Sequence, residues 1–218
     1  MLKDYVLPPL SGGVPQKLVI FLHGLGDRGD GGLLSLGQVW GRALPTTEFV
    51  CPDAPFPFDM ATPDMGGRQW FSLQDFNPAR MQEGVRTAAP ILNDYIDQSL
   101  VKRNLRANSL ALVGFSQGTM MALYVAPRRA EPMACVIGYS GLLSGGENLK
   151  NEKKSSPPVL LVHGTADEVV PYSAMAEAER GLQEAKIPVT TLPCPDFGHS
   201  IDDRGVMQGL IFLKKYLG

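Results

Sequence analysis

The chain has 218 residues, of which 44% are hydrophobic and 19% charged. This composition is sufficient for a buried core and argues against a disordered chain. The formal net charge of -2 provides no basic surplus, so we expect no nucleic acid partner and no anionic membrane surface.

Short apolar runs alternate with helical patterns along the chain. Buried strands are predicted at Lys17–Leu22, Glu48–Cys51, Leu110–Phe115, Ala134–Tyr139 and Pro158–His163, and Val189–Leu192 is a further candidate. Helical patterns cover residues 33–44, 80–101, 117–128, 172–186 and 203–217. Strands that are apolar on both faces are typical of a parallel sheet covered by helices on each side. The sequence therefore predicts an α/β fold with a mostly parallel, doubly wound sheet, in a single domain over residues 1–218.

Two longer segments interrupt this alternation. Residues 144–158 (SGGENLKNEKKSSPP) are polar, and we expect a surface loop there. Residues 54–78 contain several prolines and the aromatic pair Trp70 and Phe71. Long loops that carry aromatic side chains inside a compact domain are often functional, so this second segment is a candidate part of a site.

A serine between two glycines ends one of the predicted strands. The segment ALVGFSQGTM (111–120) contains Gly114, Ser116 and Gly118 in the spacing G-x-S-x-G, and a helical pattern follows it. A strand, a tight turn and a helix are the context in which this motif raises a nucleophilic serine. Ser116 is therefore the predicted nucleophile, and an ordinary glycine-rich turn is the alternative.

A serine hydroxyl needs a base that removes its proton. In this type of fold the acid stands between the serine and the histidine in the chain, and His199 alone leaves room for one. Asp167 follows a buried strand, at the sheet edge where sites form, and is the predicted acid. Asp196 is the competitor but has no such strand before it, and Glu168 is expected to face solvent.

The loop after the first strand admits two interpretations. Its sequence FLHGLGDRG fits the place of an oxyanion-hole loop, so the backbone N–H groups of Leu25 and of Gln117, the residue after the serine, are the predicted donors. The same loop spells G-x-G-x-x-G and is followed by Asp53, as in a dinucleotide-binding oxidoreductase. Additional glycines at 31 and 32 delay the helix, which argues against that rival.

Several other chemically suggestive residues are expected to be structural. Ser140 ends a strand but does not stand in the G-x-S-x-G spacing. Arg28-Gly29-Asp30 spells an adhesion tripeptide, which we interpret as a coincidence in such a chain. His23 and His163 are expected to form hydrogen bonds within strand-end loops rather than to bind metal. We therefore predict neither a metal site nor a cofactor.

The cysteines and the amino terminus bear on location. Cys51, Cys135 and Cys194 are scattered and form no CxxC pair, which is typical of buried thiols in a reducing compartment. The amino terminus has no apolar core like that of a signal peptide, and no apolar run is long enough to span a bilayer. The expectation is a cytoplasmic protein without membrane insertion.

Four ordered blocks carry a family resemblance. FLHGLGDRG, VGFSQGTMMAL, VHGTADEVVP and FGHS resemble the phospholipase/carboxylesterase family of α/β-hydrolases, which includes bacterial carboxylesterases and acyl-protein thioesterases. The similarity extends over nearly the whole chain. It implies the triad of Ser116, Asp167 and His199, with an oxyanion hole formed by the Leu25 and Gln117 amides.

The resemblance also implies a substrate-binding wall. Trp70 and Phe71, in RQWFSL, would line the acyl pocket, and Val169 and Val170 would add to it. Ordinary core packing is the alternative for the two aromatic residues. Thr119 stands where many relatives have glycine or alanine, and we expect it to narrow the pocket slightly.

The expected function is that of a serine carboxylesterase. It would hydrolyse short-to-medium acyl esters, small molecules or lipids, through an acyl-enzyme and in an open groove without a large cap domain. Lysophospholipase and acyl-protein thioesterase activities are the alternatives, because all three share one acyl-enzyme. The resemblance is also compatible with a homodimer.

Overall fold

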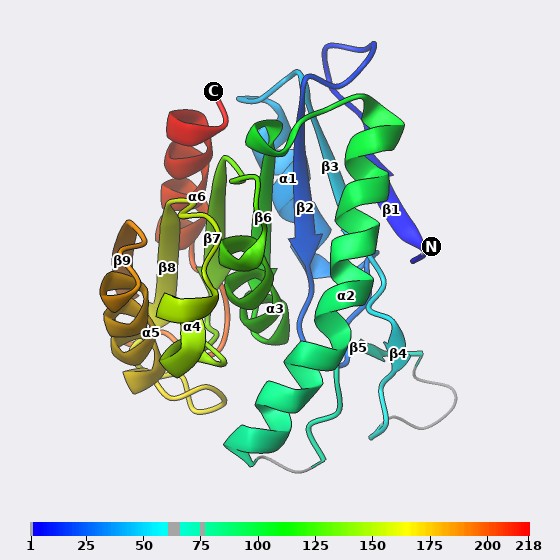
Figure 1. Ribbon diagram of the computed structural model, residues 1–218. Helices are drawn as coiled ribbons and strands as arrows, with labels where there is room; N and C mark the ends of the chain where they lie inside the picture. The colour runs from blue at the N-terminus through cyan, green and yellow to red at the C-terminus, as the bar shows by residue number, and fades with distance from the viewer. Residues whose placement is uncertain (1, 61–65, 75–76) are drawn as a thin grey trace.

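The computed structural model describes residues 2–60, 66–74 and 77–218. A seven-stranded sheet, in the order β1-β3-β2-β6-β7-β8-β9, crosses the described chain (Figure 1). Its strands are β1 (Asp4–Leu7), β2 (Lys17–Leu22), β3 (Thr47–Pro52), β6 (Leu110–Phe115), β7 (Cys135–Tyr139), β8 (Val159–Gly164) and β9 (Val189–Cys194). Only β1 pairs antiparallel with its neighbour in this sheet, so the prediction of a mostly parallel sheet is confirmed.

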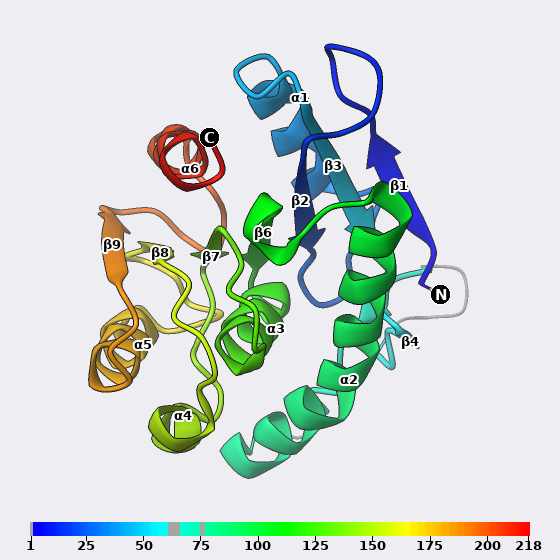
Figure 2. The same ribbon diagram turned by 45° about the horizontal axis from the view of Figure 1, so that its top comes forward.

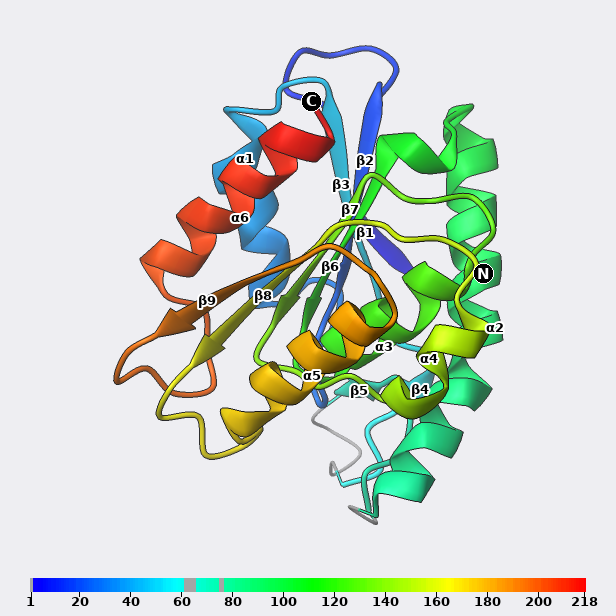
Figure 3. The ribbon, with the colours of Figure 1, turned by 60° about the vertical axis from the view of Figure 1, so that its left-hand side comes forward.

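Helices cover both faces of the sheet, as predicted. The helices are α1 (Ser35–Gly41), α2 (Pro78–Arg103), α3 (Gln117–Val125), α4 (Gly146–Glu152), α5 (Ser173–Glu184) and α6 (Asp203–Tyr216). Figure 2 shows α1 and α6 on one side of the sheet and α2, α3 and α5 on the other, with α4 beside α5. The view in Figure 3 separates the same two layers. The sheet is therefore doubly wound, with helices on both of its faces.

The alternation of side chains along the strands explains why the strand sequences are apolar throughout. In β2, Leu18, Ile20 and Leu22 pack with α2 and α3 on one face. Val19 and Phe21 point to the other face, where they pack in the cluster that includes α1 and α6 residues. All five side chains are completely buried, as expected for a parallel sheet covered on both sides.

Strand β1 and helix α4 were not predicted from the sequence. Strand β1 is a short, half-exposed edge strand, so it lacks the continuous apolar run of the inner strands. The prediction of a loop over 144–158 was wrong in part, because α4 lies within it. This helix buries only Leu149, so its sequence reads as polar.

The carboxyl ends of the parallel strands meet at one edge of the sheet. Strand β2 leads into the glycine-rich loop, β6 into Ser116, and β8 into the loop of Asp167. The pairing of Leu22 with Gly114 puts the first two of these segments side by side. A small antiparallel pair, β4 (Phe56–Pro57) with β5 (Arg68–Gln69), belongs to the segment 54–78, part of which lies outside the described residues.

Candidate active site

Ser116 forms a sharp turn between β6 and α3. Its φ of 53° and ψ of -116° are unfavourable for a residue with a side chain. The two glycines of the motif are needed for close packing, not for positive φ. A Cβ at Gly118 would lie 1.8 Å from the Leu22 carbonyl oxygen, and one at Gly114 would lie 2.5 Å from the Gly118 carbonyl carbon. The motif therefore encodes a crowded, strained turn.

The end of β7 holds this turn in place. The Ser116 N–H donates to the Tyr139 carbonyl oxygen at 2.9 Å, and the Thr119 hydroxyl donates to the same oxygen at 2.8 Å. Thr119 is buried, and a Cβ at Gly138 would lie 2.6 Å from its methyl group. Thr119 thus packs beneath the turn, and the expectation that it narrows a pocket finds no support in this position.

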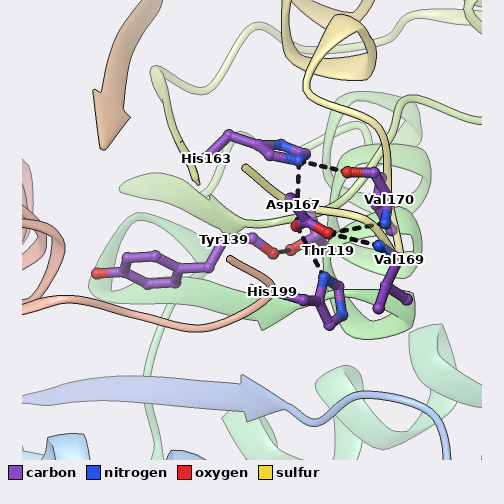
Figure 4. Close-up of polar contacts among 7 residues, drawn as sticks. All are labelled: Thr119, Tyr139, His163, Asp167, Val169, Val170 and His199. Carbon is purple, nitrogen blue, oxygen red and sulfur yellow. Dashed lines mark hydrogen bonds and ion pairs between the residues drawn. The ribbon is translucent and has the colours of Figure 1, made fainter. Parts of the chain in front are cut away.

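His199 and Asp167 form a hydrogen-bonded pair (Figure 4). The distance between Nδ1 of His199 and Oδ2 of Asp167 is 2.8 Å. The other carboxylate oxygen, Oδ1, accepts from the N–H groups of Val169 and Val170, each at 2.9 Å. Burial acts to raise the pKa of Asp167, but the bonds from His199 and the two amides outweigh it, so this pKa lies below its ordinary value. The carboxylate therefore stays ionised.

A second histidine touches the same carboxylate. Nε2 of His163 lies 2.9 Å from the Val170 carbonyl oxygen and 3.3 Å from Oδ2 of Asp167. A carbonyl oxygen can only accept, so Nε2 carries a proton and donates. His163 thereby contacts both the first and the last residue of the turn from Asp167 to Val170. The sequence indicated a strand-end hydrogen bond for His163 but not its contact with Asp167.

Neither Asp196, the competing acid, nor Glu168 has a bond to His199 among the described residues. Asp196 and Glu168 are exposed, and the Asp196 N–H donates to the Thr165 hydroxyl. Within the described part of the chain, Asp167 is the acid that contacts His199.

Phe115 links Ser116 to His199. Its ring packs against the imidazole with a centroid distance of 4.9 Å, and Ser116 is the next residue in the chain. No direct hydrogen bond joins Ser116 to His199 in the described residues. Such bonds are often long before substrate binds and tighten in the complex. The His199 side chain is 18% exposed, and Ser116 is buried, with 8% of the residue exposed.

The glycine-rich loop after β2 lies against the turn of Ser116. A Cβ at Gly24 would be 3.4 Å from the Ser116 Cβ. In the described residues, the backbone N–H groups of Leu25 and Gln117 donate to no protein group. Both predicted oxyanion donors are thus unengaged and lie on segments that flank the serine.

Trp70 and Phe71 support this loop from inside the core. They are 0% and 2% exposed, so Trp70 has no surface that could line an open pocket. The Trp70 indole N–H donates to the His23 carbonyl oxygen, and the Gln117 side chain bonds the Trp70 N–H and the Phe71 carbonyl oxygen. The core-packing alternative therefore describes the position of Trp70, whereas Phe71 also lines a cavity between the segment 56–59 and the start of α2. Val170 is also buried, whereas Val169 is 67% exposed.

His23 fastens the loop to the segment after β3. Its Nδ1 lies 2.7 Å from the Gly24 carbonyl oxygen and so carries the proton, while Nε2 accepts from the Ala54 N–H at 3.0 Å. Burial lowers the pKa of His23 below its ordinary value of 6.5, against the opposing effect of the Gly24 bond. The folded protein therefore holds His23 neutral.

This neutral histidine predicts acid sensitivity. Below about pH 6.5 the unfolded chain binds a proton at His23 that the folded chain does not, so the free energy of unfolding should fall as pH decreases. The slope from this group is at most about 1.4 kcal/mol per pH unit. Glutamine retains an acceptor for the Ala54 N–H but does not titrate. In His23→Gln, the free energy of unfolding measured with denaturant should therefore depend less on pH between pH 5 and 7. Equal pH dependence in both proteins would contradict this assignment.

The rival dinucleotide interpretation is not supported by the loop. Asp53, which would bind a ribose, accepts from the Gly29 N–H at 2.8 Å instead. The first helical turn starts only at Gly32, three residues after the last glycine of the G-x-G-x-x-G motif. Arg28 pairs with Asp30 at 3.2 Å, which gives the adhesion-like tripeptide a structural role.

Membrane and metal features were sought in the described residues as well. There, no helix is both long and apolar enough to cross a membrane. Over the same residues, no three histidine, cysteine, aspartate or glutamate side chains gather as metal ligands would.

Comparisons with known proteins agree with one another. Residues 11–217 match the model of the phospholipase/carboxylesterase family. The crystal structure of esterase PE8 is 36% identical, with a TM-score of 0.93 over 99% of both chains. Esterase YpfH of Escherichia coli K12 is 28% identical over 91% of this chain and 82% of its own. Acyl-protein thioesterase 2 of Zea mays, 24% identical over the full length of both chains with a TM-score of 0.68, shares the fold.

Proposed function

The chain belongs to the phospholipase/carboxylesterase family of α/β-hydrolases and is a carboxylic ester hydrolase, and from this premise we propose that it is a serine carboxylesterase for short-to-medium acyl esters. One observation carries the proposal. A strained serine at the end of β6 lies next to Phe115, whose ring packs on an imidazole that is hydrogen-bonded to a buried carboxylate.

The proposed mechanism assigns one role to each group. Asp167 keeps the proton of His199 on Nδ1, so Nε2 is free to take the proton of Ser116 as its oxygen attacks the acyl carbon. The Leu25 and Gln117 amides stabilise the oxyanion, each contributing about 3 kcal/mol in the transition state. The ester C–O bond then breaks, His199 returns the proton to the departing alcohol, and water hydrolyses the acyl-enzyme.

A cavity of about 700 Å³ is the proposed acyl site. It lies between α2, α4 and α5. Met81, Leu142, Leu143, Ala174 and Ala178 form the apolar part of its walls, and the polar part includes Gln82, Glu147, Glu177, Arg180 and Glu184. Leu142 follows Gly141, at which a Cβ would lie 2.9 Å from the Ser116 carbonyl oxygen. The proposed path of an acyl chain from Ser116 to this cavity runs past Leu142, the lining residue next to the segment that packs on Ser116.

We also propose a cytoplasmic location and a homodimer for this protein. Cys51, Cys135 and Cys194 are free and buried, which supports a reducing, cytoplasmic location. We retain a homodimer only as a proposal from family membership.

Covalent labelling tests the function directly. A fluorophosphonate probe should label the protein once, and peptide mapping should locate the adduct on Ser116. A panel of p-nitrophenyl esters, a palmitoyl-cysteine peptide and lysophosphatidylcholine should show fastest turnover for short-to-medium acyl esters. Absence of labelling, or an adduct elsewhere, would overturn the mechanism. Fastest turnover of the thioester would instead indicate an acyl-protein thioesterase, and fastest turnover of the lysophospholipid would indicate a lysophospholipase.

A further inference from the structure

We propose that a second, smaller cavity beside His199 binds the alcohol portion of the ester, and that this alcohol is apolar and uncharged. The inference rests on the proposed function and specifies its substrate class. The cavity has a volume of about 300 Å³, near the lower end of small-molecule sites. It lies between the glycine-rich loop, the start of α1 and the residues around the start of α6.

The position of the cavity matches the direction in which the alcohol departs. Phe115 lines the cavity and packs on the His199 imidazole, and Ser200 and Ile201, which also line it, follow His199 directly. During acylation the ester C–O bond breaks, and the leaving oxygen takes its proton from this imidazole. The leaving group must therefore lie on the side of His199. The acyl cavity lies at other elements, α2, α4 and α5.

The walls of the cavity define the chemistry of its occupant. Leu33, Leu36, Phe115, Ile201 and Val206 make it largely apolar.

Asp27 is the charged side chain among the described residues that line the cavity. Its Oδ1 accepts from the Arg28 N–H at 2.8 Å, and a Cβ at Gly31 would lie 2.0 Å from the same oxygen, so the carboxylate is held in place. The Arg28 guanidinium is engaged by Asp30 and the Tyr5 hydroxyl. A fixed negative charge beside an apolar wall disfavours anionic leaving groups such as a phosphodiester.

Gly32 provides an independent observation. The neighbouring glycines have steric reasons: a Cβ at Gly29 would lie 2.3 Å from the Cys51 carbonyl oxygen, and one at Gly31 would collide with Asp27. Gly32 has no positive φ, and a Cβ there would meet nothing within 4 Å. It lines the cavity, so its missing side chain keeps the cavity open without a requirement from the fold.

Two ester series test the assignment. One varies the alcohol of butyrate esters from methyl to hexyl, and the other varies the acyl chain of ethyl esters from acetate to octanoate. We expect kcat/KM of the natural protein to rise about threefold for each methylene added to the alcohol. Gly32→Phe should flatten the alcohol series and leave the dependence of kcat/KM on acyl chain length unchanged. Val39→Phe, at an exposed position of α1 outside the cavity, should alter neither series.

A charge test does not depend on the folding of the phenylalanine variant. Hexyl butyrate is compared with the butyrate ester of 6-hydroxyhexanoate, which has the same length but an anionic end. At low ionic strength the natural protein should prefer the neutral ester at least about tenfold, and Asp27→Asn should reduce this preference. Asn keeps the oxygen that accepts from the Arg28 N–H.

A flat alcohol series in the natural protein, or an acyl series flattened by Gly32→Phe, would overturn the inference. An unchanged preference in Asp27→Asn would overturn the charge assignment. Failure of the proposed function would look different, because fluorophosphonate labelling of Ser116 and all ester turnover would then be absent.

Discussion

Replacement of Ser116 by alanine is expected to reduce ester turnover by about six orders of magnitude, to the level of the oxyanion hole and substrate binding alone. This loss corresponds to about 8 kcal/mol of transition-state stabilisation. The reason is chemical, because no acyl-enzyme can form without the hydroxyl. Alanine fits the same strained turn, so the melting temperature should change little. Hydrolysis of p-nitrophenyl butyrate and a thermal melt provide the two measurements.

Ser140 is a matched control for this substitution. It also follows a parallel strand, has a positive φ of 46° and is 1% exposed. Within the described residues its hydroxyl has no hydrogen-bond partner. Ser140→Ala should leave turnover unchanged and should not lower stability, because it removes a buried, unpaired polar group. Activity retained by Ser116→Ala, or lost only by Ser140→Ala, would refute the nucleophile.

Asp167→Asn is expected to lower kcat by about four orders of magnitude with little change in shape. The Val169 and Val170 N–H groups both donate to Oδ1, so the amide oxygen of the asparagine must occupy that place. Its NH2 group then faces Nδ1 of His199. Two donors cannot bond, so the imidazole must move its proton to Nε2, where it can no longer accept from Ser116.

Nitrogen NMR of the histidines measures this tautomer change directly. The natural protein should show His199 protonated at Nδ1, and the asparagine variant should show it at Nε2. Asp196→Asn serves as the control, because Asp196 is exposed and does not contact His199. An active Asp167→Asn protein, or equal losses from the two variants, would show that Asp167 does not orient the base.

The strands and the residues at their ends could be predicted from the sequence. The inner strands are apolar on both faces, and this pattern fixed β2, β6 and β8 closely. Chain order and the strand end before Asp167 predicted that Asp167 would pair with His199, and the structure brings Nδ1 of His199 and Oδ2 of Asp167 to 2.8 Å. Their catalytic roles, with that of Ser116, stay predictions that the substitutions above test.

Other features depended on contacts between distant segments. Trp70 was predicted to line the acyl pocket, but its bonds to the Gln117 side chain and the His23 carbonyl oxygen hold it in the core. The contact of His163 with Asp167 depends on how the turn between them folds back.

The sequence by itself determined the inner parallel strands, the tight serine turn and the place of Asp167 just after β8, because each is encoded within a short stretch of residues or by strand order. Only the tertiary structure decided which side chains are open to substrate. The exposure of a side chain depends on which distant segments pack against it, and a local sequence pattern does not encode that packing. The open space beside Gly32 is an example, since Phe115, at the end of β6, and Ile201, just before α6, line it from distant parts of the chain.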